Sequence, residues 1–167
     1  MAEPRRSAFA EALAANARFV EHFAPPKLGP APARALAVIA CMDSRIVVED
    51  VLSLRSGDAH IIRNAGGLAT DDALRSLVIS QRLLGTEEVI VMEHTDCGML
   101  TLRDAELRRA LIAGTGTDVD LPLLAFTDLE ANLRAQVQRI RSHPWIKDAA
   151  VHGLVYEVET GRLRGIG

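Results

Sequence analysis

The sequence predicts an α/β fold: a mainly parallel four-stranded sheet with a short fifth strand at one edge and helices on both faces. Apolar runs at residues 35–41 and 88–93 continue without alternation, as strands that are covered on both faces require. Segments with helical spacing of apolar residues lie between such runs. Strands that alternate with helices favour parallel pairing with right-handed crossovers, so these two observations together indicate the fold class.

The size and composition of the chain indicate a single globular domain. Its 167 residues are 49% hydrophobic and 25% charged, which suits a single domain with a substantial core. A net charge of −3 and the lack of a basic run argue against nucleic acid and anionic membranes as partners. We find neither a membrane-spanning window nor a signal peptide, so we expect a cytoplasmic protein with reduced cysteines.

Residues 1–34 are expected to be a separate element, and residues 35–167 a single α/β domain. A helix is predicted from Ser7, its expected cap, to about residue 23, because large apolar side chains recur on one side of it. These are Phe9, Leu13, Val20 and Phe23. The proline-rich residues 24–32 cannot continue that helix and predict a semi-extended arm. We expect a helix on such an arm to pack on a partner subunit.

The remaining elements alternate along the chain. Further strands are predicted at 60–63 and 149–156, with the short edge strand at Leu163. Helices are predicted over residues 48–52, 70–84, 97–111 and 127–143. Thr70 and Gly85 are expected to begin and end the second of these helices, and Thr127-Asp128-Leu129-Glu130 is a capping box for the last.

The only two cysteines of the chain follow buried strands. Cys41 ends the first strand, and Cys97 follows the third strand together with His94. Zinc favours thiolate and imidazole, and a catalytic zinc site typically has three protein ligands and one position open to water. We therefore predict a zinc site formed by these three residues. Inert core cysteines are the plain alternative, and a thiol-redox pair is a weaker one because the spacing is not CxxC.

Asp43 and Arg45 follow the first cysteine at short intervals. We expect Asp43 to accept a hydrogen bond from water on the metal, while Arg45 holds its carboxylate in a charge-assisted pair. Two thiolates neutralise the charge of zinc, so that water is less acidic than at a three-histidine site and activity is expected to favour alkaline pH. Asp43 is also close enough to swing onto the metal when Arg45 releases it, which would give a closed, inactive state.

These residues lie in motifs that resemble those of β-class carbonic anhydrases, specifically the short prokaryotic, cab-type branch. The motifs are Cys41-Met42-Asp43-Ser44-Arg45, Arg63-Asn64-Ala65-Gly66-Gly67 and His94-Thr95-Asp96-Cys97-Gly98-Met99. The resemblance implies a lyase that hydrates carbon dioxide reversibly to bicarbonate through hydroxide on zinc. It implies Cys41, His94 and Cys97 as ligands and Asp43 with Arg45 as the catalytic dyad. It also implies a homodimer or a dimer of dimers, with the N-terminal helix on the neighbouring subunit.

Some features of the sequence leave alternatives open. Glu93 stands where many members of that family have glycine, and residues 112–126 match weakly, so we assign neither a role. A carbon disulfide or carbonyl sulfide hydrolase of the same fold remains open, because these molecules are also small, linear and electrophilic at carbon. A non-catalytic zinc protein is a further alternative, against which the presence of Asp43 and Arg45 argues.

Overall fold

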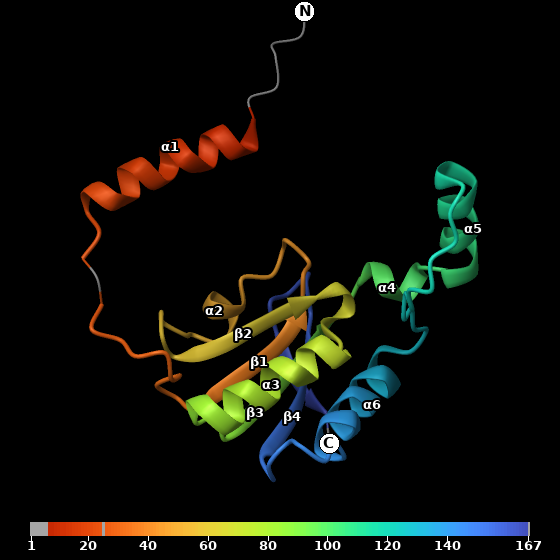
Figure 1. The fold of residues 1–167 in the computed structure, drawn as a ribbon. Coiled ribbons are helices and arrows are strands. Elements are labelled where there is room, and N and C mark those ends of the chain that lie inside the picture. The colour runs from red at the N-terminus through yellow and green to blue at the C-terminus, as the bar shows by residue number, and fades with distance from the viewer. Residues whose placement is uncertain (1–6, 25, 167) are drawn as a thin grey trace, which may run out of the picture.

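The computed structural model describes residues 7–24 and 26–166, and a five-stranded sheet forms its centre (Figure 1). The strands are β1 (Leu36–Cys41), β2 (Ala59–Asn64), β3 (Glu88–His94), β4 (Ala150–Tyr156) and β5 (Leu163–Ile166). Their order is β2-β1-β3-β4-β5, and only β5 pairs antiparallel to its neighbour. The predicted fold class, including the short edge strand, is confirmed. Residues 1–6 and Pro25 of the predicted arm lie outside the described residues.

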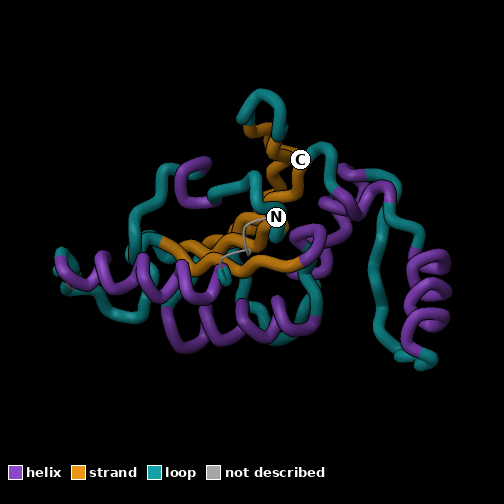
Figure 2. Tube along the Cα trace, turned by 90° about the horizontal axis from the view of Figure 1, so that it is seen from above, coloured by secondary structure: helices purple, strands orange, loops and turns teal. Residues whose placement is uncertain are grey.

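Helices lie on both faces of the sheet, as Figure 2 shows. They are α1 (Ala8–Glu21), α2 (Val48–Val51), the short 3-10 helix η1 (Ala65–Gly67), α3 (Asp71–Leu84), α4 (Gly98–Thr101), α5 (Asp104–Thr115) and α6 (Leu129–Arg141). The apolar side chains of α3 and α6 pack together on one face, whereas those of α2 pack on the other. Two hydrophobic cores result, one on each side of the sheet.

The central strands divide their side chains between these two cores. Val89 and Val91 of β3 lie in the core covered by α3 and α6, whereas Met92 lies in the other core with both cysteines. Since successive side chains of a strand point to opposite faces, the next two residues follow the same alternation. Glu93 therefore lies on the side of α6, and His94 lies on the side of the cysteines.

The helix caps agree with the prediction at one helix and differ at two others. At α3, Thr70 accepts a hydrogen bond from the Ala73 amide (3.4 Å), and Gly85 ends the helix in the left-handed conformation. At α6 the cap is Asp128, which accepts from the Ala131 amide (2.9 Å), so the predicted capping box is wrong by one residue. Ser7 makes no side-chain cap hydrogen bond with the described residues, because its exposed helix end is open to water.

The single helix predicted over residues 97–111 is wrong. The chain forms α4, leaves the helical conformation at Leu102 and Arg103, and begins α5 at Asp104. The Arg103 guanidinium donates to the carbonyls of Thr101 and Leu102 (3.4 and 3.3 Å), which a continuous helix would use for its own amides. α5 then projects away from the sheet (Figure 1) and buries none of its described residues.

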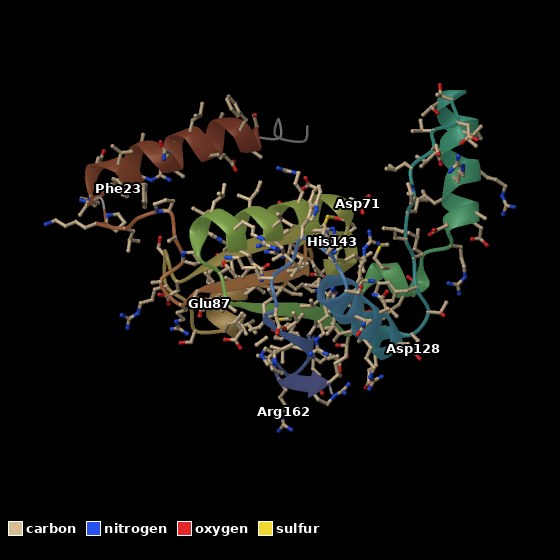
Figure 3. All side chains as sticks on the ribbon, turned by 60° about the horizontal axis from the view of Figure 1, so that its bottom comes forward. Phe23, Asp71, Glu87, Asp128, His143 and Arg162 are labelled. Atoms are coloured by element: carbon tan, nitrogen blue, oxygen red, sulfur yellow. The ribbon has the colours of Figure 1, made fainter. Side chains whose placement is uncertain are left out.

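The N-terminal arm is fastened to the domain, but α1 is not. The amides of Ala33 and Arg34 donate to the carbonyls of Gly57 and Asp58 (2.8 and 3.0 Å), and the carbonyl of Pro30 contacts His60 (3.0 Å). α1 itself buries no described residue, and Phe23, just beyond its end, lies away from the sheet (Figure 3). No helix among the described residues has both the length and the hydropathy needed to cross a membrane.

Gly67 and Gly85 offer a matched test of how closely η1 packs on the strand ends. Both have positive φ, of 70° and 78°, but a Cβ at Gly67 would lie 2.9 Å from the Cys41 amide nitrogen, whereas one at Gly85 would meet nothing within 4 Å. Gly85→Ala should cost about 1–2 kcal/mol of unfolding free energy from backbone strain alone. Gly67→Ala should cost roughly 1–3 kcal/mol more, because backbone atoms cannot move aside. Urea denaturation measures both, and equal losses would contradict the close packing.

Candidate metal centre

The three predicted ligands meet at the carboxyl edge of the sheet. Cys41 is the last residue of β1, His94 is the last residue of β3, and Cys97 caps α4. β1 and β3 are paired in parallel, so their ends lie next to each other. All three side chains are buried, and their ligand atoms lie within 4.8 Å of one another. The structure thus brings Cys41 beside His94 and Cys97, which lie far from it in the sequence.

The turn that carries His94 and Cys97 is anchored to β4. The Thr95 amide donates to the Tyr156 carbonyl (3.0 Å), and the Thr95 hydroxyl accepts from the Val158 amide (3.1 Å). Asp96 then takes a left-handed conformation, with φ of 55°, which aspartate tolerates better than most residues. This left-handed residue turns the backbone so that the Cys97 side chain lies beside His94.

His94 presents one ring nitrogen to the thiols. Its Nδ1 lies 2.8 Å from the Thr95 carbonyl, which can only accept, so Nδ1 carries the proton. Its Nε2 is buried and has no hydrogen-bond partner among the described residues. Burial acts to lower the pKa of His94, but Cys41, the Thr95 carbonyl and Asp43 together outweigh burial, so the pKa is raised. A histidine that donates one N–H to a carbonyl and leaves the other nitrogen free has the usual arrangement of a metal ligand.

The two thiols are free and interact with each other. Their mutual hydrogen bond lowers the pKa of Cys41 to about 4 and, together with burial, raises the pKa of Cys97. One sulfur of the pair therefore ionises more readily than the other. A buried anion is costly unless a cation compensates it, and metal binding releases thiol protons. The donor set fits a zinc ion, and inert core cysteines do not explain it.

Asp43 and Arg45 form a close pair beside this group. The Arg45 Nε and Nη2 donate to the Asp43 Oδ1 and Oδ2 (3.0 and 2.7 Å), and the Arg45 amide also donates to Oδ1 (2.9 Å). These hydrogen bonds hold the pKa of Asp43 well below its usual range, so its carboxylate stays ionised. Its Oδ2 lies 3.8 Å from the His94 Nε2. The structure therefore has Asp43 next to the ligand group but held by Arg45.

Two further residues that sequence reasoning gave no role support the site. The Asp96 carboxylate and carbonyl accept from Arg45 (2.7 and 3.1 Å), which orients the guanidinium from its far side. Arg63 donates to the carbonyls of Cys41 and Asp43 (2.9 and 2.7 Å) and so fixes the backbone on both sides of Met42. Both residues lie within the motifs, but their roles depend on strand register and on the turn after β3, which spacing alone does not give.

Glu93 lies behind the site, on the other face of the sheet. Its side chain is 1% exposed, and its Oε1 accepts from the Asn132 side chain of α6 (2.7 Å). Burial raises the pKa of Glu93 to about 8, and the hydrogen bond from Asn132 only partly opposes this. The carboxyl therefore points away from the ligand group, although it is adjacent to His94 in the sequence.

A cleft of about 640 Å³ opens in front of the two cysteines and the Asp43–Arg45 pair. Its other walls are mainly apolar and come from the segment after β1, the 3-10 helix η1 and α4. The apolar side chains among them are Met42, Ala65, Met99 and Leu102. Few polar groups converge on an otherwise apolar space, which suits a small uncharged molecule.

Comparisons with known proteins agree with this geometry. The sequence model of a family described as "Carbonic anhydrase" matches residues 36–116. The chain is 41% identical to β-carbonic anhydrase 1 of Mycobacterium tuberculosis over 155 residues, covering 92% of this chain and 94% of that protein. It is 40% identical to a carbon disulfide hydrolase of Acidithiobacillus thiooxidans, covering 78% of this chain and 76% of that one.

A solved structure shows the same relationship in three dimensions. The crystal structure of carbonic anhydrase from Streptococcus mutans superposes with a TM-score of 0.92 at 40% identity, covering 98% of this chain and 100% of that one. The similarity extends over the sheet, the helices and the segments that carry the buried cysteines and histidine. The chain therefore belongs to the β-carbonic anhydrase family.

Proposed function

We propose that this protein is a zinc-dependent carbonic anhydrase in which Cys41, His94 and Cys97 hold the metal. The observation that carries the proposal is the buried group of two thiols and one imidazole with a free Nε2, next to an ionised carboxylate. Zinc at this group supplies the Lewis acidity that makes water reactive toward carbon dioxide. Membership of the β-carbonic anhydrase family supports this reaction as the one that is catalysed.

Asp43 and Arg45 serve as the catalytic dyad in this proposal. The Asp43 carboxylate accepts a hydrogen bond from the reacting water and orients it, and it stays ionised because Arg45 occupies both of its oxygens. Asp96 keeps Arg45 in this position. For Asp43 to reach the metal itself, as in the closed state, its three hydrogen bonds with Arg45 must break. The close Asp43–Arg45 pair supports the open state, in which water would complete the zinc site.

Hydrolysis of carbon disulfide, or of the related carbonyl sulfide, is a second candidate activity. The 40% identity to a carbon disulfide hydrolase favours it, and the apolar cleft suits carbon disulfide as well as carbon dioxide. Both substrates are linear and electrophilic at carbon, so the same ligand group and dyad serve both. We prefer carbon dioxide because the β-carbonic anhydrase relative matches more of the chain, 92% against 78%.

A second copy of the chain is the proposed partner of α1. The arm is fastened at Ala33 and Arg34, yet α1 exposes a row of large apolar side chains that the domain does not cover. These are Phe9, Leu13, Phe19 and Val20, with Phe23 following the helix. Packing residues 1–34 on a neighbouring 35–167 domain gives a homodimer or a dimer of dimers. Reactive thiols that must stay reduced to bind zinc suit the cytoplasm.

Metal analysis of the purified protein tests the ligand set. We expect about one zinc per chain in the wild type and a near-complete loss of zinc in Cys97→Ser and His94→Ala. The site has three protein ligands, and the loss of one leaves too few to hold the ion. His152→Ala is the matched control, since His152 is an exposed histidine paired with Glu88 (3.0 Å). Full zinc content in His94→Ala would contradict the assignment.

Stopped-flow hydration of carbon dioxide tests the activity and the dyad. We expect wild-type activity to rise from neutral to alkaline pH. The depressed pKa of Asp43 keeps it ionised over this range, so its titration does not cause the rise. Asp43→Ala should lose activity by about 10²–10⁴-fold at every pH while zinc is retained.

Asp72→Asn is the control for this assay, because Asp72 forms a similar but exposed pair with Arg75 (2.8 Å) and does not line the cleft. Unchanged hydration in zinc-loaded Asp43→Ala would rule out the dyad. A zinc-loaded wild type that is inactive on carbon dioxide but releases sulfide from carbon disulfide would establish the second candidate activity instead.

Sedimentation velocity tests the role of α1. The double substitution Leu13→Glu with Val20→Glu places charges on the exposed apolar side, and we expect it to shift the protein from the assembled form to the monomer. Each buried side chain of this kind contributes about 1.5–3 kcal/mol to an interface. Arg18→Glu, on the opposite side of the helix, is the control and should leave the assembly intact. Equal assembly of both variants would show that α1 packs elsewhere.

A further inference from the structure

A line of hydrogen bonds, which is partly buried along α6, begins at buried Glu93 directly behind the metal group. Glu93 accepts from the Asn132 Nδ2 (2.7 Å), the Asn132 Oδ1 accepts from the Gln136 Nε2 (3.1 Å), and the Gln136 Oε1 accepts from the Ala69 amide (3.0 Å). Asn132 and Gln136 are four residues apart on α6 and so lie on the same side of it. The line connects the end of β3 with the turn that precedes α3.

Both ends of this line lie against the metal group. At one end, Glu93 shares a strand end with His94, so any rotation of the strand that moves one side chain also moves the other. At the other end, the turn after β2 is packed on the strand ends. A Cβ at Gly67 would lie 2.9 Å from the Cys41 amide nitrogen and 3.0 Å from the Met92 carbonyl. The line therefore spans the two strand ends that carry Cys41 and His94.

The same turn is rigid in itself. The Asn64 side chain accepts from the Leu68 amide (2.8 Å) and donates to the Leu68 carbonyl (2.7 Å), which closes the loop around η1. The Ala69 amide, which follows this closed loop, is the group that Gln136 holds. Because these hydrogen bonds close the turn, a displacement of the Gln136 side chain would move the turn as a unit.

General stability does not explain the line. α6 already packs on the sheet through Leu133, Val137 and Ile140, which belong to the same buried core as β3. The Oε2 of Glu93 has no hydrogen-bond partner among the described residues. Burial of this carboxyl therefore costs more free energy than burial of an apolar side chain of similar size. Unlike an apolar side chain, the Glu93 carboxyl accepts a directional hydrogen bond from Asn132. This hydrogen bond restricts rotation of the end of β3.

We propose that Glu93, Asn132 and Gln136 are positioning residues of the metal site. They hold the end of β3, and with it the His94 imidazole, in register with the turn that lies against Cys41. The proposal rests on the metal site proposed above. It predicts that zinc affinity and ligand geometry respond to substitutions on the far face of the sheet, where no residue contacts the metal.

Zinc affinity, measured by competition with a chromophoric chelator, tests the line. Glu93→Leu and Asn132→Leu each remove a link, and we expect about 10–100-fold weaker zinc binding, as is typical when a partner behind a ligand is lost. Glu93→Gln keeps an acceptor for Asn132 and should retain most of the affinity. The double substitution Glu93→Leu with Asn132→Leu should add little to either single change, because both break the same contact.

The absorption spectrum of the cobalt-substituted protein provides a readout that loss of stability does not alter. Visible bands of cobalt depend on the angles between its ligands, so we expect them to shift in the Leu variants but not in Glu93→Gln. Gln136→Met is the variant of choice if Glu93→Leu does not fold, because Gln136 is only partly buried. Gln138→Met makes the same change on the exposed side of α6 and should leave affinity and spectrum as in the wild type.

The outcomes separate this inference from the proposed function. A wild-type protein that binds no zinc overturns both. A wild type that binds zinc tightly, with unchanged affinity and unchanged cobalt spectrum in Gln136→Met and in folded Glu93→Leu, overturns the positioning role alone. Weaker binding with a shifted spectrum in Gln136→Met, but not in Gln138→Met, establishes it.

Discussion

Two buried thiols that interact with each other are the constraint on which the rest of this structure depends. The interaction with Cys97 favours a thiolate at Cys41, although burial in a mainly apolar core opposes it. Without a cation such an arrangement costs stability, so this end of the sheet must be held in place by interactions elsewhere. Arg63 on the Cys41 carbonyl, the close approach of Gly67 and the tie from Thr95 to β4 provide that support. These contacts hold the strand ends that carry the two thiols and the imidazole close together.

Because side chains alternate along β3, His94 and Glu93 lie on opposite faces of the sheet and have different surroundings. One face presents His94 to the two thiols, which line the cleft. The other presents Glu93 to α6, where no substrate reaches. A single peptide bond joins His94, a proposed metal ligand, to Glu93 and the hydrogen bonds behind it, so the position of α6 is relevant to the proposed metal site.

Much of the fold and of the ligand group could be predicted from the sequence, because both depend on patterns of short range. Uninterrupted apolar runs identified β1 and β3, and reactive side chains directly after them indicated a shared edge of a parallel sheet. The break at Leu102 was missed because no glycine or proline marks it. It depends on the Arg103 guanidinium, which donates to the preceding Thr101 carbonyl. The roles of Arg63 and Asp96 were also missed, since each depends on a contact across the sheet or across a turn.

The choice between carbon dioxide and carbon disulfide lies outside the metal group. Both molecules are linear and uncharged, and the proposed ligand group and Asp43–Arg45 pair would serve either reaction. Carbon disulfide is the larger and more apolar of the two, so discrimination depends on the width and polarity of the approach rather than on a hydrogen bond to the substrate. In this chain the approach passes Met42, which is 65% exposed, and the walls from Met99 and Leu102. A second copy of the chain that packed near this opening would narrow it, and subunit assembly would then affect which substrate enters.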